Sequence, residues 1–296
     1  MFSQNNDRWT VTTTLLRLST TGVCFGLGVI ALVYDLPVRE LLWDESWWSW
    51  FANGLGYSWT AWVTSAGVDH KISCFVKGVG VGLLVCGIAA LLLKRPGKFL
   101  WVVFVFLLLQ HLLEFKSHFW QLGQLLELCL QTSAPLLLYW WIVQGRTSSA
   151  NRAGAFRRQS FFWLTVRILI ALTFVGHGLY AVGLYPVPAN FILMTQAGVG
   201  LSEATARRLL LTVGILDFLA AALLLLPKRQ SQLMALWWII PWAILTSLAR
   251  IWSYGSLVTT ETLLWQWLPE TVRRLPHVLI PLASWLRLRA TDENPA

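Results

Sequence analysis

Long runs of apolar residues, separated by short polar connections, dominate the sequence. Eight runs have about the 20-residue length that a helix needs to cross roughly 30 Å of hydrocarbon. Because lipid offers backbone groups no hydrogen-bond partner, segments of this kind span membranes as helices. The pattern therefore predicts an all-α, polytopic membrane protein with eight transmembrane helices. The predicted spans cover residues 11–34, 72–93, 98–115, 121–143, 161–183, 203–226, 231–252 and 268–288.

The composition agrees with this fold class. Only 12% of the 296 residues are charged, 56% are hydrophobic and the mean hydropathy is +0.59, whereas soluble domains are about a quarter charged. The net charge of +9 would suggest nucleic acid in a soluble protein, but here it favours basic loops on one membrane face. We expect the lipid bilayer as a partner and no nucleic acid. The four cysteines form no CxxC pair, so we predict no metal site.

The basic residues set the predicted orientation. With the N-terminus in the cytoplasm, the outer connections carry Arg39, Lys71 and Lys116, and the inner ones carry a much larger basic set. The positive-inside rule then places both termini in the cytoplasm, in a multi-pass protein of the inner (plasma) membrane. The first apolar run follows no basic region or cleavage site, so we interpret it as a retained helix and not a signal peptide. The inner basic set is Lys94, Arg95, Lys98, Arg146, Arg152, Arg157, Arg158, Lys228, Arg229, Arg287 and Arg289.

A tryptophan-rich segment, residues 35–71, forms the longest outer connection. Tryptophan favours the headgroup zone, where the ring is apolar and the N–H is hydrated. We expect amphipathic helices on the non-cytoplasmic surface here, with shorter versions at 184–202 and 253–267. The segment is also a candidate contact surface for a membrane or extracytoplasmic protein partner.

The second half of the chain resembles the first. The stretch 16-LRLSTTGVCFGLG-28 aligns with 166-VRILIALTFVGHG-178, residues 77–98 align with 208–229, and 127–141 align with 273–287. An even number of helices in each half gives both halves the same orientation. The predicted organisation is a first four-helix repeat over 1–143, a cytoplasmic linker over 144–160 and a second repeat over 161–296.

Ionisable residues within the second-half spans are the candidate functional residues. A charge at the bilayer centre costs at least about 2.5–3.5 kcal/mol, so such side chains face the protein interior and pair there. Counting along the helices puts His177 about 9 Å and His277 about 13 Å below the outer surface, and Asp217 about 21 Å. We expect a polar pocket open to the outer face. The candidates for ligand binding or proton handling are His177, His277, Asp217, Arg208, Arg250, Arg273 and Glu270.

Structural roles are the alternative for the same residues. The arginines and Glu270 could form salt bridges at the outer helix ends, with snorkelling side chains, and His177 could be a core histidine bonded to a carbonyl. Asp217 could donate a hydrogen bond to the carbonyl of Trp237, which Pro241 leaves without its helical partner. In the first half, Lys77 and Glu127 form a plausible buried pair.

The second half resembles DoxX-like four-helix membrane proteins. The similarity rests on the GHG segment around His177, the surface stretch 186-PVPANFILMTQAGVGLS-202, the helix 213-VGILDFLAAALLLLPKR-229 and the final 273-RRLPHVLIPL-282. It covers residues 161–289, and residues 11–143 would be a diverged copy. The resemblance implies either a membrane subunit of an oxidoreductase, since some DoxX-like proteins belong to thiosulfate:quinone oxidoreductase, or a receptor or chaperone, since the wider superfamily includes those.

Several functions stay open at this stage. The first is a membrane subunit of a quinone-linked or sulfur-linked redox system, with a quinone or another small molecule as the ligand of His177, His277 and Asp217. The alternatives are a small-anion transporter, or a non-catalytic receptor, chaperone or assembly partner. Haem binding by the two histidines is a further alternative.

Overall fold

The computed structural model describes residues 2–147 and 152–290, which fold into helices and contain no strand. Seven of these helical segments are long and apolar enough to cross a membrane. The chain is therefore a multi-pass membrane protein. The candidate spans are Trp9–Val33, Ala66–Leu92, Phe99–Ser117, Leu122–Gly145, Arg157–Ala181, Glu203–Leu225 and Arg229–Tyr254.

The long helices follow the predicted spans closely, and short helices lie in the connections between them and at the starts of two predicted spans. The long ones are α1 (Phe2–Val33), α5 (Ala66–Leu92), α6 (Phe99–Ser117), α8 (Cys129–Thr147), α9 (Arg152–Ala181), α11 (Glu203–Leu225), α12 (Arg229–Tyr254) and α15 (Leu275–Ala290). The short ones are α2 (Pro37–Leu42), α3 (Glu45–Gly54), α4 (Trp59–Thr64), α7 (Leu122–Glu127), α10 (Ala189–Val199), α13 (Thr260–Thr262) and α14 (Leu268–Val272), with a π-helical turn at Leu263–Trp267.

The eighth predicted span, 268–288, is a divided segment. It consists of α14 and then α15, which has 16 residues and is shorter than the about 20 that a straight crossing needs. Pro276 lies in the first turn of α15, where a missing N–H is tolerated and favours a new helix start. A similar break separates α7 from α8 at Leu128. An eighth crossing therefore stays a prediction at this point.

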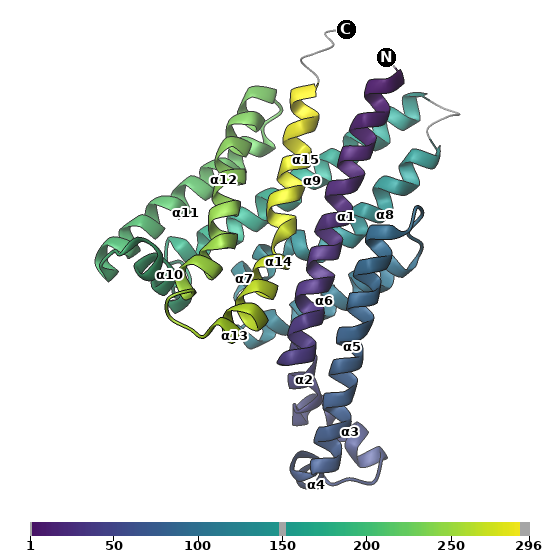
Figure 1. Ribbon diagram of the computed structural model, residues 1–296, viewed down its shortest axis with the longest axis vertical. Coiled ribbons are helices and arrows are strands. Elements are labelled where there is room, and N and C mark those ends of the chain that lie inside the picture. The colour runs from purple at the N-terminus through teal and green to yellow at the C-terminus, as the bar shows by residue number, and fades with distance from the viewer. Residues whose placement is uncertain (1, 148–151, 291–296) are drawn as a thin grey trace.

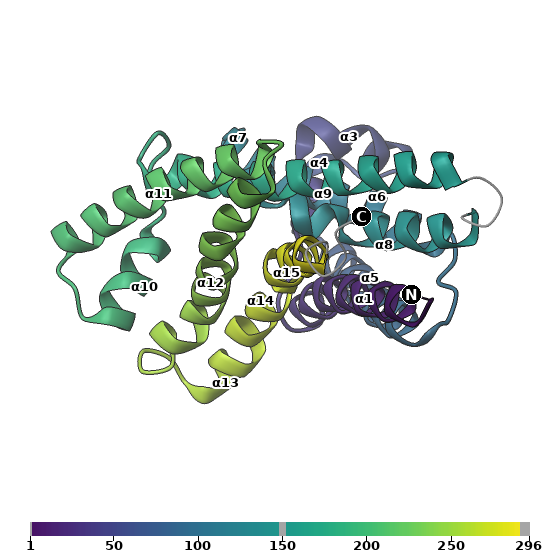
Figure 2. The same ribbon diagram turned by 90° about the horizontal axis from the view of Figure 1, so that it is seen from above.

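The two halves interlock. Helix α1 packs against α5 and α9 packs against α11, while α1 also contacts α14 and α15, and α9 contacts α7 and α8. Helix α1 begins and α15 ends at the same end of the bundle (Figure 1). Seen along the bundle, α10 and α11 lie at one side and α1 and α5 at the other, with α15 between them (Figure 2).

Apolar side chains cover both the interior and much of the outside. Phe162, Leu138 and Leu236 are fully buried in the main core, whereas Leu92 and Val102 are each 71% exposed. An outward apolar surface of this extent suits lipid and not water. The helix faces therefore support a lipid bilayer as the environment.

The segment α2–α4 lies at the far end of the bundle, beyond the end of α1 (Figure 1). Helix α5 begins at Ala66, with Ser65 as its N-cap, six residues before the start of the predicted span at 72. The extra residues lengthen α5 at this end and hold the segment beyond the bundle. Asp44 caps α3 by accepting a hydrogen bond from the Ser46 N–H at 3.1 Å, and it forms an ion pair with Lys116 at the end of α6. This pair attaches the segment to the membrane-spanning helices.

Close backbone packing fixes α9 between two neighbours. A Cβ atom at Gly176 would meet the backbone N of Glu127, and it would lie 2.6 Å from the carbonyl oxygen of Gly123. One at Gly178 would lie 3.1 Å from the carbonyl oxygen of Gly214. The glycines beside His177 thus let the backbones of two neighbouring helices, α7 and α11, approach α9 closely.

We expect Gly176→Ala to lower the stability of the purified protein by about 1–3 kcal/mol, because the added methyl group collides with the α7 backbone. Gly82→Ala is the matched control: nothing lies within 4 Å of its Cβ position, and it should stabilise α5 by about 0.5–1 kcal/mol. Thermal unfolding in detergent measures both. Equal midpoints for the two variants would contradict the close approach of α9 and α7.

The ion pair of Asp44 predicts a pH dependence. Hydrogen bonds from Lys116 and then Ser46 lower the pKa of Asp44 below the unfolded value of about 3.9. Its stabilisation is thus present above that value and is lost as the pH falls through the lower folded pKa. Asp44→Asn keeps the cap and removes the charge, so we expect faster protease cleavage within residues 43–65 at neutral pH.

That difference should be small, about 0–1 kcal/mol for a partly exposed pair, and should vanish as the pH falls below the lowered pKa of Asp44. Glu45→Gln is the control, because Glu45 is an exposed carboxylate on the same helix. The same acceleration in both variants would show that the loss of one negative charge, and not the loss of this pair, is responsible.

Candidate functional site

A histidine–aspartate pair lies at the centre of the second half. His177 Nδ1 on α9 is 2.7 Å from Asp217 Oδ2 on α11, and the Trp238 Nε1–H of α12 donates to Asp217 Oδ1 at 2.9 Å. Asp217 has no solvent exposure. Three helices thus hold one carboxylate, and Asp217 in turn orients the imidazole of His177.

This geometry corrects the expected position of Asp217. The residue does not lie far below His177, and its partners are His177 and the Trp238 indole instead of the carbonyl of Trp237. Counting 1.5 Å per residue assumes upright helices. Helix α11 is strongly inclined to α1 and α5 (Figure 1), so it gains less depth per residue and brings Asp217 level with His177.

A buried ion pair lies on the other side of His177. Glu127 Oε1, on α7, is 2.8 Å from Arg274 Nη2, between α14 and α15. Both residues are less than a tenth exposed. The pair joins the two halves of the chain. The predicted pairing of Glu127 with Lys77 is wrong, because Lys77 lies on an exposed face of α5.

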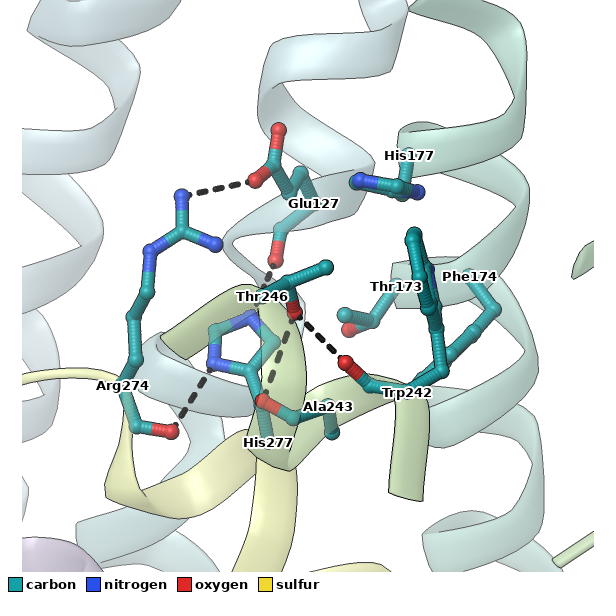
Figure 3. Close-up of a pocket in the computed structure, with 9 residues that line it drawn as sticks. All are labelled: Glu127, Thr173, Phe174, His177, Trp242, Ala243, Thr246, Arg274 and His277. Carbon is teal, nitrogen blue, oxygen red and sulfur yellow. Dashed lines mark hydrogen bonds and ion pairs between the residues drawn. The ribbon is translucent and has the colours of Figure 1, made fainter. Parts of the chain in front are cut away.

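A small cavity of about 20 Å³ separates these groups, with room for about one water molecule. His177 and Glu127 lie on opposite sides of it, and one ring nitrogen of His177 is turned toward Glu127 (Figure 3). The lining residues are Glu127, Thr173, Phe174, His177, Trp242, Ala243, Thr246, Arg274 and His277. Both candidate histidines therefore line the same space.

His277 has a different role from His177. Its Nε2 is 3.1 Å from the backbone oxygen of Glu127, and its Nδ1 is 3.3 Å from that of Arg274. A neutral imidazole has one N–H and can donate to only one of these carbonyls. Both ring nitrogens face backbone, so His277 ties α15 to α7 and forms one wall of the cavity (Figure 3).

The remaining candidates lie outside the cavity. Arg273 forms ion pairs with Glu270 at 3.1 Å and with Glu114 at 3.6 Å. Arg250 is 5% exposed, and its Nη1 donates to the carbonyl of Thr246, a cavity residue, at 3.1 Å. Arg273 and Glu270 thus form a salt bridge of the kind that the structural alternative described, whereas Arg250 donates to a carbonyl of its own helix.

Arg208 does not join the cluster. It is exposed, and the buried face of α11 carries Ala206, Leu210, Val213 and Asp217. Arg208 and Asp217 are nine residues apart, about two and a half turns, which places them on opposite faces of the helix. The estimated depth of Arg208 suggested that it belonged to the pocket. Its position around the α11 helix, on the exposed face, excludes it from the cavity.

Sequence reasoning missed Glu127 and Arg274 as site residues. One signal was available: the internal alignment pairs Glu127 with Arg273, so opposite charges occupy matching places in the two halves. Thr173, Thr246 and Trp242 gave no signal, because nothing distinguishes them from other residues of an apolar helix until the fold is known.

Comparison with known proteins adds no assignment: no family model, no curated protein and no solved structure matches the chain. The chemistry of the site must therefore come from its own geometry. In the part of the chain that is described, no three His, Cys, Asp or Glu side chains are grouped to hold a metal ion. The cavity also leaves no room for a haem between His177 and His277.

The arrangement suits proton exchange. A carboxylate that accepts from Nδ1–H fixes the tautomer of an imidazole and leaves the other nitrogen available. For His177 that nitrogen is turned toward Glu127 (Figure 3), so one imidazole lies between two carboxylates of opposite halves. Phe191 lies 5.1 Å and Trp242 6.3 Å from the imidazole, ring centre to ring centre, and these rings limit access of water.

We expect His177→Leu and Asp217→Leu each to cost about 1–3 kcal/mol of stability, because each leaves the other buried group without its main partner. The double variant should cost clearly less than the sum, since both polar groups are then gone. Unfolding of the three variants in detergent measures the coupling. Strictly additive losses would contradict a His177–Asp217 hydrogen bond.

Proposed function

We propose that this protein is a DoxX-like membrane subunit of a quinone-linked or sulfur-linked redox system, in which the cluster around His177 binds a small ligand and exchanges a proton with it. The observation that carries the proposal is the position of His177: bonded to Asp217, turned toward Glu127 and walled by aromatic rings. Ionisable groups at membrane depth mark ligand or proton pathways.

The chemistry of a quinone fits these residues. A quinone carbonyl needs a hydrogen-bond donor, and its reduction consumes protons that a histidine can supply. Asp217 and Glu127 stabilise the protonated imidazole by opposite charge. The sequence has no CxxC and no flavin or iron–sulfur motif, so the electrons would come from a partner protein.

The size of the cavity sets a condition on this proposal. A space of about 20 Å³ holds a water molecule and not a quinone ring. A ring would enter only if the side chains of Trp242 and Phe174, which wall the cavity (Figure 3), moved aside. In the packed state, water in the cavity would relay protons between His177 and Glu127.

We further propose that α14 and α15 together form an eighth crossing and that the chain is a tandem duplication. Helix contacts support this. A Cβ at Gly26 would lie 2.5 Å from the Pro269 oxygen and 2.8 Å from the Arg273 nitrogen. Gly176, 150 positions later, meets Gly123 and Glu127 in the same way. Each first helix thus packs on the short helix of the other half.

The second glycine contact of each half repeats as well. Gly28 packs on the carbonyl of Gly80, and Gly178 packs on that of Gly214. In these contacts Gly80 corresponds to Gly214, an offset of 134 residues. The sequence alignment of residues 77–98 with 208–229 has an offset of 131, so the two registers differ by three positions. It places leucines, Leu27 and Leu83, where the second half has His177 and Asp217. The proton-handling pair therefore belongs to the second half only.

The orientation follows from the same end of the bundle. The connection between α5 and α6, the start of α12 and the end of α15 carry the basic residues, and α1 begins at this end (Figure 1). By the positive-inside rule, we propose that this end of the bundle lies in the cytoplasm and that the protein is in the inner (plasma) membrane. The cavity is then nearer the outer face.

A non-catalytic role as a receptor, chaperone or assembly partner is the second candidate function. The observation that favours it is the exposure of Trp47 and Trp50, 52% and 69%, on a segment that extends beyond the bundle (Figure 1). Exposed tryptophans are typical anchors of protein interfaces. For a small-anion transporter we find no comparable observation, because the basic side chains at the cavity are already paired.

The decisive experiment is ligand binding by the purified protein. Organic extraction of freshly purified protein should release a quinone, and a short-chain quinone should raise its unfolding temperature. In the double variant His177→Leu/Asp217→Leu, we expect at least about a tenfold loss of affinity, as for one lost charge-assisted hydrogen bond. His70→Leu, on the exposed outer part of α5, is the control.

Two results would overturn the redox proposal. One is the absence of both extracted quinone and stabilisation in the wild type. The other is unchanged quinone binding in the double variant. Stable co-purification of a partner that is lost in Trp47→Ala/Trp50→Ala would then support the second candidate.

A further inference from the structure

A cluster of donor groups lies between α9 and α15, and it is nearer than the cavity to the end of the bundle where α1 begins (Figure 1). The guanidinium of Arg287 on α15 lies 5.0 Å over the ring of Trp163 on α9. Arg167 follows Trp163 by one turn, and it is close enough to Arg287 for the two charges to repel. Helices α9 and α15 are in direct contact.

The cluster has donors and no acceptors. Arg167 Nε and Trp163 Nε1 are buried, and neither has a hydrogen-bond partner in the described part of the chain. Trp163 is only 2% exposed. Among the same residues, neither Arg167 nor Arg287 forms an ion pair with a carboxylate. Guanidinium and indole groups can only donate, so what completes this cluster must accept.

The first half provides an internal comparison. Arg17 on α1 is the residue that aligns with Arg167, and its side chain is satisfied: it donates to the carbonyls of Leu91 at 2.6 Å and Lys94 at 3.2 Å. Leu91 lies in the last turn of α5 and Lys94 follows its end, so Arg17 acts as a helix cap. Arg167 makes no such contact with the end of α11. A capping role therefore explains Arg17 and leaves Arg167 unexplained.

We propose that Trp163, Arg167 and Arg287 form a binding site for a phosphate group, supplied by the headgroup of a membrane lipid. Two neighbouring cations at the edge of hydrocarbon are costly without a counter-charge. A phosphate oxygen cluster offers the missing acceptors, and guanidinium groups bind it through paired hydrogen bonds.

The position of the site favours a lipid as the source of the phosphate. Arg287 is three residues from the end of α15, about 5 Å along the helix. If α14 and α15 form the proposed eighth crossing, this position is at the level of the headgroups. Side chains of α9 lean toward its N-terminus, so Arg167 reaches toward the same level. Arg289, over the ring of Trp285 at 5.2 Å, adds positive charge nearby.

The test is lipid-dependent stabilisation of delipidated protein in neutral detergent. We expect a short-chain phosphatidylglycerol to raise the unfolding temperature and the diacylglycerol with the same chains, which lacks phosphate, to have no effect. Arg167→Gln and Arg287→Gln should each weaken the lipid about ten- to a hundredfold, as for a lost charge-assisted hydrogen bond. Arg17→Gln, at the matching place in the first half, should leave the lipid response intact.

Each shift is measured against the same variant without lipid, so a loss of stability alone does not count as a loss of binding. If either glutamine variant fails to fold, the corresponding lysine variant, which keeps the charge and loses the planar fork, should give an intermediate affinity. Stabilisation by inorganic phosphate alone, dependent on Arg287, would assign the site to free phosphate. No response to either probe, or an equal response in Arg17→Gln and Arg287→Gln, would overturn the proposal.

Discussion

The ion pair between Glu127 and Arg274 is the interaction on which the centre of this protein depends. Hydrocarbon does not solvate charge, so a carboxylate on α7 and a guanidinium beside α15 are stable at this depth only together. Because the two residues belong to opposite halves, their pairing brings α7, α9 and α15 to one point. The cavity and the orientation of His177 follow from that convergence.

Glycine packing supplies the second constraint, and it explains why the charges meet at short distance. Gly176 lets the α7 backbone lie directly against α9, which brings Glu127 and His177 to the same cavity. A larger residue would separate the helices and leave both groups facing lipid or each other across a gap. The two constraints therefore act together. The ion pair stabilises the contact between the helices, and the glycine allows their backbones to approach closely enough to form it.

Much of the fold could be predicted from the sequence, and less of the site. Apolar run length located seven helices, because the bilayer imposes one length on all of them. His177, His277 and Asp217 were found because ionisable residues are rare in such runs. Their geometry was not, since the inclination of α11 and the phase of Arg208 depend on packing between helices. Glu127 was given the wrong partner, Lys77, and Arg274 was not named, because only the packing of α7 against α14 and α15 brings the two residues together.

The breaks between α7 and α8, and between α14 and α15, have an evolutionary consequence. An interrupted helix leaves main-chain oxygen atoms without their usual partners, and one of these, at Glu127, receives the imidazole of His277. Main-chain atoms are the same for every amino acid. Genetic drift can therefore replace the side chain at position 127 without removing that acceptor, so one anchor of the site persists through changes that would abolish the ion pair.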